Sequence, residues 1–375
     1  MPDLRVNVDL IGQGGQSQGD VAGRLTTNGQ LNVGRMRPFL AEDRFGVLQA
    51  YATVYIGGNP KNPASYRTSL INANATLRRE EWKALDEAIL EEKKMRLGGA
   101  DDLISRGLVY NLGNAMGTTV LEWHDVSGSM DAVISMDGLT RGKGDRPNYQ
   151  HNYLPIPIIH VDYEINAREL SASRSLGNPL DTTVAQRATR EINETIEEML
   201  FTDTAYGFGE NDSRGRNKIY SYLNFPDRNT VNLSIPWDHS AISPAGIIQD
   251  VQDAKEAARL NHFYGPFVLY IPANYERKLD DDYTTTVSGT TITIADRIMK
   301  LKNIAAIKVI DKLPSDNVLL VQMTSDVVRM VNGMGLTNVE WAVEGNMLTK
   351  YKVMTIQVPQ IRSDQNGKCG IVHMS

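Results

Sequence analysis

Residues 153–203 read YLPIPIIHVDYEINARELSASRSLGNPLDTTVAQRATREINETIEEMLFTD, and this stretch decides the fold of the chain. It passes from an apolar, β-rich segment through a short polar turn into one long amphipathic helix. It holds no combination of nucleophile, general base or metal ligands. The stretch therefore predicts an element that braces a scaffold, and not a catalytic one.

The helical part of this stretch has a start signal and one apolar face. Asn178 is a good N-cap, Pro179 suits the first helical position, and Asp181 places a negative charge in the first turn. The predicted packing face of this helix consists of Val184, Ala188, Ile192, Ile196 and Met199. Its acidic end, around Glu197 and Glu198, opposes the helix dipole. Either basic groups lie nearby or the charges are simply solvated.

Before this stretch, the chain predicts an arm, a helix and a ribbon. Residues 11–34 are rich in Gly, Gln, Asn and Thr and predict a flexible arm, followed by an alternating strand pattern within 38–75. Residues 77–99, LRREEWKALDEAILEEKKMRLGG, predict a helix with Gly98 as its stop signal. Residues 118–163 predict two strands joined by a polar, glycine-rich tip. Such a ribbon is marginal alone in water and should lie on another subunit.

After the stretch, the pattern alternates between helices and buried strands. A helix is expected from Ser243 to about His262. Residues 262–283, HFYGPFVLYIPANYERKLDDDY, predict a turn, a buried strand and a short helix. Helix and strand follow over 294–314, another buried strand over 317–323, and β-rich segments towards the C-terminus.

The order of these elements, with residues 77–99, 153–203 and 262–283, resembles the tailed-phage major capsid proteins of the Hong Kong 97 type and their cellular relatives, the encapsulins. The resemblance implies an α+β fold with a peripheral domain and spine helix, an axial domain, an extension loop and an N-terminal arm. The implied divisions are 1–75 (arm), 76–117 (N-terminal helix and connector), 118–163 (extension loop), 164–204 (peripheral domain with spine helix), 205–325 (axial domain) and 326–375 (strands returning to the peripheral domain).

The function implied by this resemblance is that of a major capsid protein. Copies would assemble as pentamers and hexamers into an icosahedral procapsid and virion shell around phage double-stranded DNA, in the host cytoplasm. The implied partners are other copies of the chain, DNA bound without sequence preference, portal and scaffolding proteins, and a decoration protein; no membrane is implied. The alternative is an encapsulin-type nanocompartment that encloses a cargo enzyme.

Two sets of basic residues are candidate contacts. At the tip of the extension loop, Arg141, Lys143 and Arg146 are expected to form ion pairs with neighbouring subunits. In the arm, Arg24, Arg35 and Arg37 are candidate DNA contacts. The resemblance also implies a less favoured alternative for Lys143, a covalent bond to Asn346 of a neighbour with Glu344 as base.

Composition excludes several other classes of protein. The 375 residues carry a net charge of −6, which disfavours a dedicated nucleic-acid-binding protein. The single cysteine, Cys369, excludes an intramolecular disulfide, and the six histidines show no metal-binding spacing. The glycine-rich start, IGQGGQSQG, lacks the Lys-Ser/Thr of a phosphate-binding loop. The sequence predicts no enzyme, no cofactor and no metal.

Overall fold

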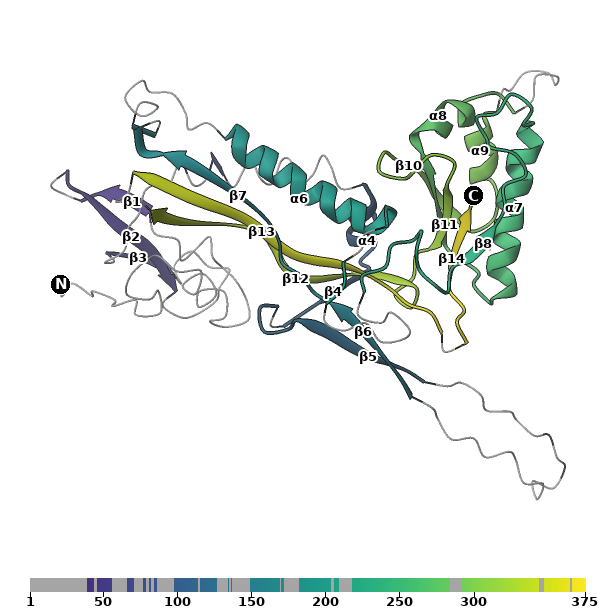
Figure 1. Cartoon of the computed structure of the whole chain (residues 1–375), viewed down its shortest axis with the longest axis horizontal. Helices are drawn as coiled ribbons and strands as arrows, with labels where there is room; N and C mark the ends of the chain where they lie inside the picture. Colours follow the sequence, from purple (N-terminus) through teal and green to yellow (C-terminus); the bar gives the residue numbers. More distant parts are fainter. Residues whose placement is uncertain are drawn as a thin grey trace.

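The computed structural model of the chain describes residues 39–43, 46–55, 66–70, 77–78, 81, 84–85, 98–113, 115–126, 134, 136, 149–168, 170–171, 182–203, 206–208, 218–283, 292–343, 347–364 and 366–375. These residues form an elongated body with a long sheet and a spine helix at its centre, a compact α/β unit at one end and a small sheet at the other (Figure 1). A ribbon of two strands projects away from the long sheet.

The long sheet has the strand order β4-β12-β13-β7, and its strands are β4 (Val109–Asn111), β7 (Ile159–Asn166), β12 (Val328–Val343) and β13 (Leu348–Ile361). Helix α6 (Thr183–Phe201), the spine helix, lies along β7 and β13, and helix α4 (Gly98–Ser105) packs against its C-terminal half. We call these elements the peripheral unit. The predicted return of C-terminal strands beneath the spine helix is confirmed for β12 and β13.

The spine helix begins later than its sequence signals predict. Its first residue is Thr183, and Thr182 is the N-cap without a side-chain capping bond, while residues 178–181 lie outside the described residues. The expected packing face is wrong at one position: Val184 is 44% exposed, and Ala185 is buried in its place. Each four-residue step on a helix drifts by about 40°, which carries Val184 off the face centred on Ile192.

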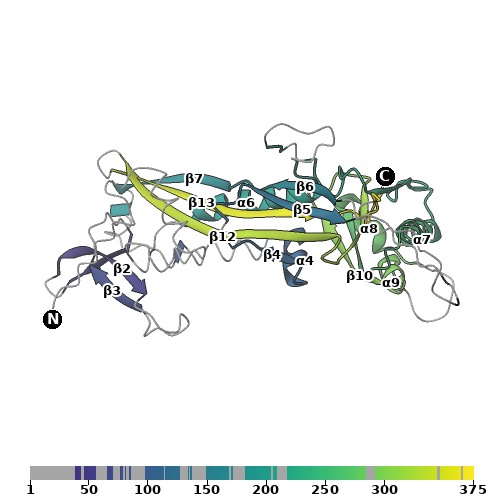
Figure 2. The ribbon, with the colours of Figure 1, turned by 90° about the horizontal axis from the view of Figure 1, so that it is seen from below.

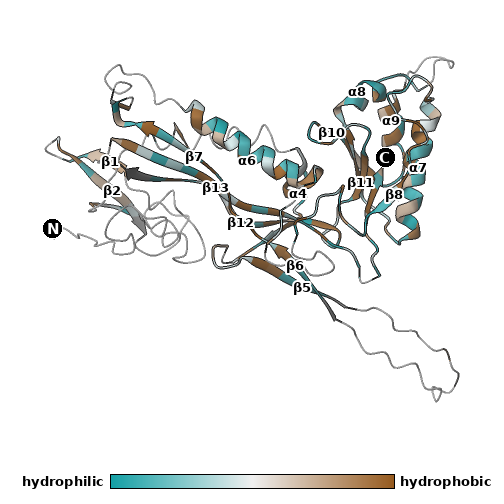
Figure 3. Cartoon of the chain, in the orientation of Figure 1, coloured by the Kyte–Doolittle hydropathy of each residue, from teal (hydrophilic) through white to brown (hydrophobic). Residues whose placement is uncertain are grey.

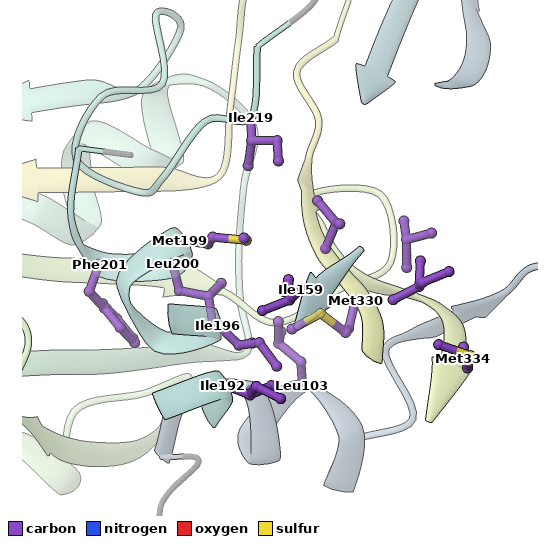
Figure 4. Close-up of a cluster of buried hydrophobic side chains, with 14 of the residues drawn as sticks. Leu103, Ile159, Ile192, Ile196, Met199, Leu200, Phe201, Ile219, Met330 and Met334 are labelled. Carbon is purple, nitrogen blue, oxygen red and sulfur yellow. The ribbon is translucent and has the colours of Figure 1, made fainter. Parts of the chain in front are cut away.

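The side chains beneath the spine helix form one apolar core with the long sheet. Ala188, Ile192, Ile196 and Met199 are all buried. In Figure 4 Ile192, Ile196 and Met199 lie among side chains from the neighbouring elements, and these include Leu103 of α4, Ile159 of β7 and Met330 of β12. Full burial of one such side chain contributes roughly 1.5–3 kcal/mol, so the helix is held mainly by this face.

The compact α/β unit, here the axial unit, has a sheet of order β10-β9-β11-β14-β8. Its elements are β8 (Asn229–Val231), α7 (Pro244–Leu260), β9 (Phe267–Pro272), α8 (Ala273–Leu279), α9 (Ile294–Met299), β10 (Ile304–Ile310), β11 (Val318–Gln322) and β14 (Ile371–Met374). The predicted helices and strands between Ser243 and Met323 are confirmed. Ser243 caps α7, its hydroxyl accepting a hydrogen bond from the Gly246 N–H at 3.1 Å. In Figure 3 strand β11 of this unit is mainly hydrophobic, as a buried central strand should be.

The last strand departs from the expected division of the chain. We expected residues 326–375 to return together to the peripheral domain, but β14 lies inside the axial sheet, antiparallel to β11 and parallel to β8. All its residues are buried, which requires a position covered on both faces. The C-terminus therefore closes the axial unit.

The ribbon consists of β5 (Val120–Val126) paired antiparallel with β6 (Tyr149–Pro155). The expected second strand, running to Tyr163, is wrong in its extent because Ile159–Asn166 is β7 of the long sheet. Pro155 and Pro157 lie at the break, and a proline has no N–H with which to continue a strand ladder. Figures 1 and 2 place the ribbon across the face of the long sheet opposite the spine helix.

The chain ahead of Gly98 is described only in part. Strands β1 (Phe39–Glu42), β2 (Leu48–Tyr55) and β3 (Tyr66–Leu70) form an antiparallel three-stranded sheet. Most of the helix predicted over residues 77–99 lies outside the described residues. Gly98 is not the end of that helix in the described part but the first residue of α4. No helix among the described residues is long and apolar enough to cross a bilayer.

Candidate assembly surfaces

The peripheral and axial units meet at the C-terminal end of the spine helix. Glu197, although charged, is only 7% exposed there. Its Oε2 accepts a hydrogen bond from the backbone N–H of Gly98 at 3.0 Å, at the N-terminus of α4. Burial raises the pKa of Glu197 above its usual value, and the bonds from the Gly98 and Gly99 N–H groups oppose that rise. The carboxylate thus caps a second helix.

Gly99 allows this close approach of the two helices. A Cβ atom placed at Gly99 would lie 2.3 Å from the Cε2 atom of Phe201 and 3.3 Å from Leu200. No side chain fits at such distances, so α4 can present its N-terminus to the spine helix only with glycine here. Gly98, which was expected to stop a helix, therefore starts one.

A second polar link centres on Asp102 of α4, which is 3% exposed. Its carboxylate lies 2.9 Å from Arg106 Nε and 3.1 Å from Lys308 Nζ of β10, and it accepts a hydrogen bond from Tyr270 OH of β9 at 2.8 Å. Burial of Asp102 would raise its pKa, but the hydrogen bonds from Arg106, Tyr270 and Lys308 outweigh burial and hold the pKa below its usual value. One carboxylate thereby joins α4 to two strands of the axial sheet.

A third link binds the outer face of the spine helix. Lys312, just after β10, lies 2.9 Å from Glu194 and 2.9 Å from Glu198, which are one helical turn apart. The hydrogen bonds that Lys312 donates to these two carboxylates raise its pKa, and the side chain is thus held charged. The expected basic groups near the acidic end of the helix are present, and the alternative of simple solvation is wrong for Glu197. Sequence reasoning missed Asp102, Lys308 and Lys312.

The ribbon has one covered face and one outward face. Leu154 and Ile156 are buried against the body, with Leu121 and Trp123 packed beside them. On the outward face Glu122, His124 and His151 are exposed. The basic tip residues expected to contact neighbours, Arg141, Lys143 and Arg146, lie outside the described residues, as do Glu344, Asn346 and the arm residues Arg24, Arg35 and Arg37.

The described residues contain no cluster of three or more His, Cys, Asp or Glu side chains suited to a metal ion. Cys369 is buried, and burial raises the pKa of its thiol to about 12. A thiol with so high a pKa is a poor nucleophile at neutral pH. The geometry of the described part is that of a braced scaffold with a projecting ribbon.

Comparison with known proteins places the chain in a family. The sequence profile of a family of unknown function, DUF6260, matches residues 72–374. The chain belongs to DUF6260. This DUF6260 chain is also 24% identical over 284 residues to the type 1 encapsulin shell protein EncA of Myxococcus xanthus strain DK1622, over 75% of this chain and 85% of EncA.

Solved structures show the fold of this DUF6260 chain. The virus-like particle from Pyrococcus furiosus aligns with a TM-score of 0.55 and 18% identity, over 79% of this chain and 100% of that one. The capsid of Myoviridae phage XM1 aligns with a TM-score of 0.51 and 11% identity, over 68% and 85% of the two chains. The chain has the Hong Kong 97-type fold of phage capsids and encapsulins, which confirms the predicted fold class.

Proposed function

We propose that this chain is a shell-building protein, the major capsid protein of a tailed phage. The observation that carries the proposal is the ribbon, whose strands β5 and β6 pair only with each other among the described residues. Two-stranded ribbons are marginal alone in water, and this one projects beyond the body (Figure 1). A surface supplied by another copy of the chain would stabilise it.

The relatives support this proposal. A phage capsid and a virus-like particle each match over about two thirds or more of this chain. In the proposed shell, copies associate as pentamers and hexamers into an icosahedron that encloses double-stranded DNA. Portal, scaffolding and decoration proteins are the further proposed partners. The net charge of −6 suits a wall that does not cling to the nucleic acid inside.

The contacts proposed between copies divide into two kinds. Apolar burial between copies supplies affinity, since obligate interfaces commonly bury roughly 2,000–5,000 Å². Arg141, Lys143 and Arg146 at the ribbon tip set orientation, because exposed ion pairs contribute only about 0–1 kcal/mol each. Arg24, Arg35 and Arg37 of the arm are the proposed DNA contacts. The arm, extension loop, peripheral and axial divisions follow the sequence prediction, with β14 assigned to the axial unit.

A second candidate function is an encapsulin-type compartment around a cargo enzyme. The observation that favours it is the similarity to EncA, which is named as a type 1 encapsulin shell protein and matches over 85% of its length. Residues 1–71, which include the β1–β3 sheet, lie outside the DUF6260 match. This N-terminal segment is an addition to the minimal encapsulin fold, and it favours the phage capsid over the encapsulin.

Electron microscopy of particles made by the chain, with nuclease-protected DNA measured alongside, tests both candidates. Icosahedral shells holding genome-length DNA support the capsid, and small uniform shells holding protein support the encapsulin. A small oligomer that never closes into shells contradicts both. Deletion of residues 138–146 is a sharper test: the isolated chain should keep its far-ultraviolet circular dichroism and unfolding transition but lose assembly. Shells of normal yield from that variant would contradict the role of the ribbon tip.

A further inference from the structure

Two histidines face each other across the ribbon. His124 of β5 and His151 of β6 are directly paired in the strand register, so their Cα atoms are cross-strand partners. Their ring centroids lie 4.3 Å apart with the ring planes at 89°. The chain has six histidines, and the other described ones have no such mutual contact. Paired strands thus bring together two residues that are far apart in sequence.

The position of this pair does not serve the core. Both imidazoles lie on the exposed, outward face of the ribbon, while Leu154 on the other face is buried against the body. An exposed ring adds little to the stability of the fold through burial, and an aromatic edge contact contributes only about 0.5–1.5 kcal/mol. The two imidazoles lie side by side in solvent, and each can bind a metal ion through a ring nitrogen.

We propose that His124 and His151 form a two-histidine site for a divalent transition-metal ion of the class that imidazole prefers, such as Zn²⁺, Ni²⁺ or Cu²⁺. Directly opposed residues on antiparallel strands have Cβ atoms about 4.5–5.5 Å apart. Metal–nitrogen bonds of about 2.0–2.1 Å then require rotation of the side chains but no movement of the backbone. Water fills the remaining coordination positions, because no third His, Cys, Asp or Glu completes a cluster among the described residues.

Such a site would clamp the two strands of the ribbon at the point where they leave the body. A metal that binds the paired strands and not the separated ones stabilises the pairing by a free energy that grows with the logarithm of the metal concentration over its dissociation constant. The ribbon pairs with no third strand among the described residues, so a clamp between its two strands would stabilise it. This inference does not rest on the proposed shell, because binding is measured on the chain itself whether or not shells form.

His160 provides a matched control. It is an exposed histidine on β7, and its cross-strand partner is Met354. The test uses the full chain without a histidine tag, stripped with chelator and titrated with ZnCl₂ alone in a calorimeter. The wild type and His160→Ala should bind one Zn²⁺ per chain with the same affinity. His124→Ala and His151→Ala should each weaken binding at least tenfold.

Equal Zn²⁺ affinity in wild type, His124→Ala and His151→Ala overturns the site. So does a loss of affinity in His160→Ala as large as the loss in His124→Ala and His151→Ala. Where an alanine variant fails to fold, His124→Gln and His151→Gln replace it. Hydrogen exchange supplies a second readout: Zn²⁺ should slow exchange of the β5 and β6 amides at least tenfold in wild type and leave them unchanged in His124→Gln. Unchanged β5 and β6 exchange in Zn²⁺-bound wild type also overturns the clamp.

Discussion

The carboxylate of Glu197 accepts a hydrogen bond from the backbone N–H of Gly98 at 3.0 Å, across 99 residues of sequence. The spine helix thereby caps α4, and α4 in turn reaches the axial sheet through Asp102 and Lys308. Lys312 closes the same junction from the other side. The relative placement of the peripheral and axial units is therefore fixed by a short chain of polar contacts around an apolar core.

The first prediction concerns the cap made by Glu197. Glu197→Ala should destabilise the fold by about 1–2 kcal/mol, because it leaves the α4 N–H groups without their acceptor. Glu197→Gln keeps an acceptor oxygen and removes a buried charge, so it should cost much less at pH 7. Urea unfolding of both variants measures the difference. Equal losses in the two variants would show that the cap is not the role of this side chain.

The pH dependence of Glu197 follows from its raised pKa. Glu197 holds its proton more tightly in the folded chain than in the unfolded one. Its pH-dependent contribution to stability is therefore fully present below the usual carboxyl pKa and is lost as the pH rises through the pKa of the folded state. Wild type should therefore lose stability relative to Glu197→Gln as the pH rises from 4 to 7. A difference between the two proteins that stays constant with pH would contradict the assigned shift.

The second prediction concerns the link at Asp102. Asp102→Asn should destabilise by about 2–3 kcal/mol, at the low end for a broken buried pair because Lys308 and Arg106 are partly solvated. The pKa of Asp102 is lowered, so its contribution is present above the usual carboxyl pKa and is lost as the pH falls through the folded value. Acid unfolding curves should show a steeper loss of stability below pH 4 in wild type than in the variant.

The third prediction concerns the ion pairs that Lys312 forms with Glu194 and Glu198 of the spine helix. Lys312→Met should cost about 1 kcal/mol or less, because the ion pairs with Glu194 and Glu198 are partly exposed. The effect should shrink in high salt. Lys278→Met is a matched control, since the ion pair of Lys278 with Asp281 lies within the axial unit. Limited proteolysis near the end of the spine helix should accelerate in Lys312→Met only. Equal acceleration in both variants would show that the ion pairs of Lys312 do not hold the spine helix to the axial unit.

The sequence predicts the elements of this fold better than their junction. Apolar periodicity identifies α7, whereas unbroken apolar runs identify β9 and β11, whose residues are all buried. The start of the spine helix is misplaced because Asn178 and Pro179 are a strong local signal, whereas the helix begins at Thr183. The ribbon is overextended because Ile159 and Val161 are as apolar in the long sheet as they would be in the ribbon.

The polar junction is invisible to local patterns for a physical reason. Asp102, Lys308 and Tyr270 come from three separate elements. Only the tertiary fold brings Lys308 Nζ and Tyr270 OH within 3.1 Å of the Asp102 carboxylate. The one usable signal is the acidic end of the spine helix, which opposes the helix dipole and requires positive charge nearby. That signal predicts a basic partner but cannot name Lys312, or show that the partner of Glu197 is a helix N-terminus.

The fourth prediction concerns His373 in β14, an inner strand of the axial sheet. Its Nε2 lies 2.7 Å from Asn317 Oδ1, and its Nδ1 accepts a hydrogen bond from Arg228 Nε at 3.4 Å. Burial, and after it the charge of Arg228, lower the pKa of His373 to about 4. The imidazole is therefore held neutral in the fold.

Between pH 6.5 and about 4 the unfolded chain binds a proton at this position and the folded chain does not, so wild type should lose stability as the pH falls through that window. His373→Gln removes the titrating group and should flatten this part of the profile, whereas His160→Gln, at an exposed histidine of β7, should leave it unchanged. Urea midpoints at pH 7.5 and pH 4.5 measure the effect. A wild-type loss equal to that of His373→Gln would mean that His373 takes up its proton without unfolding, and that the axial sheet tolerates a charge on this inner strand.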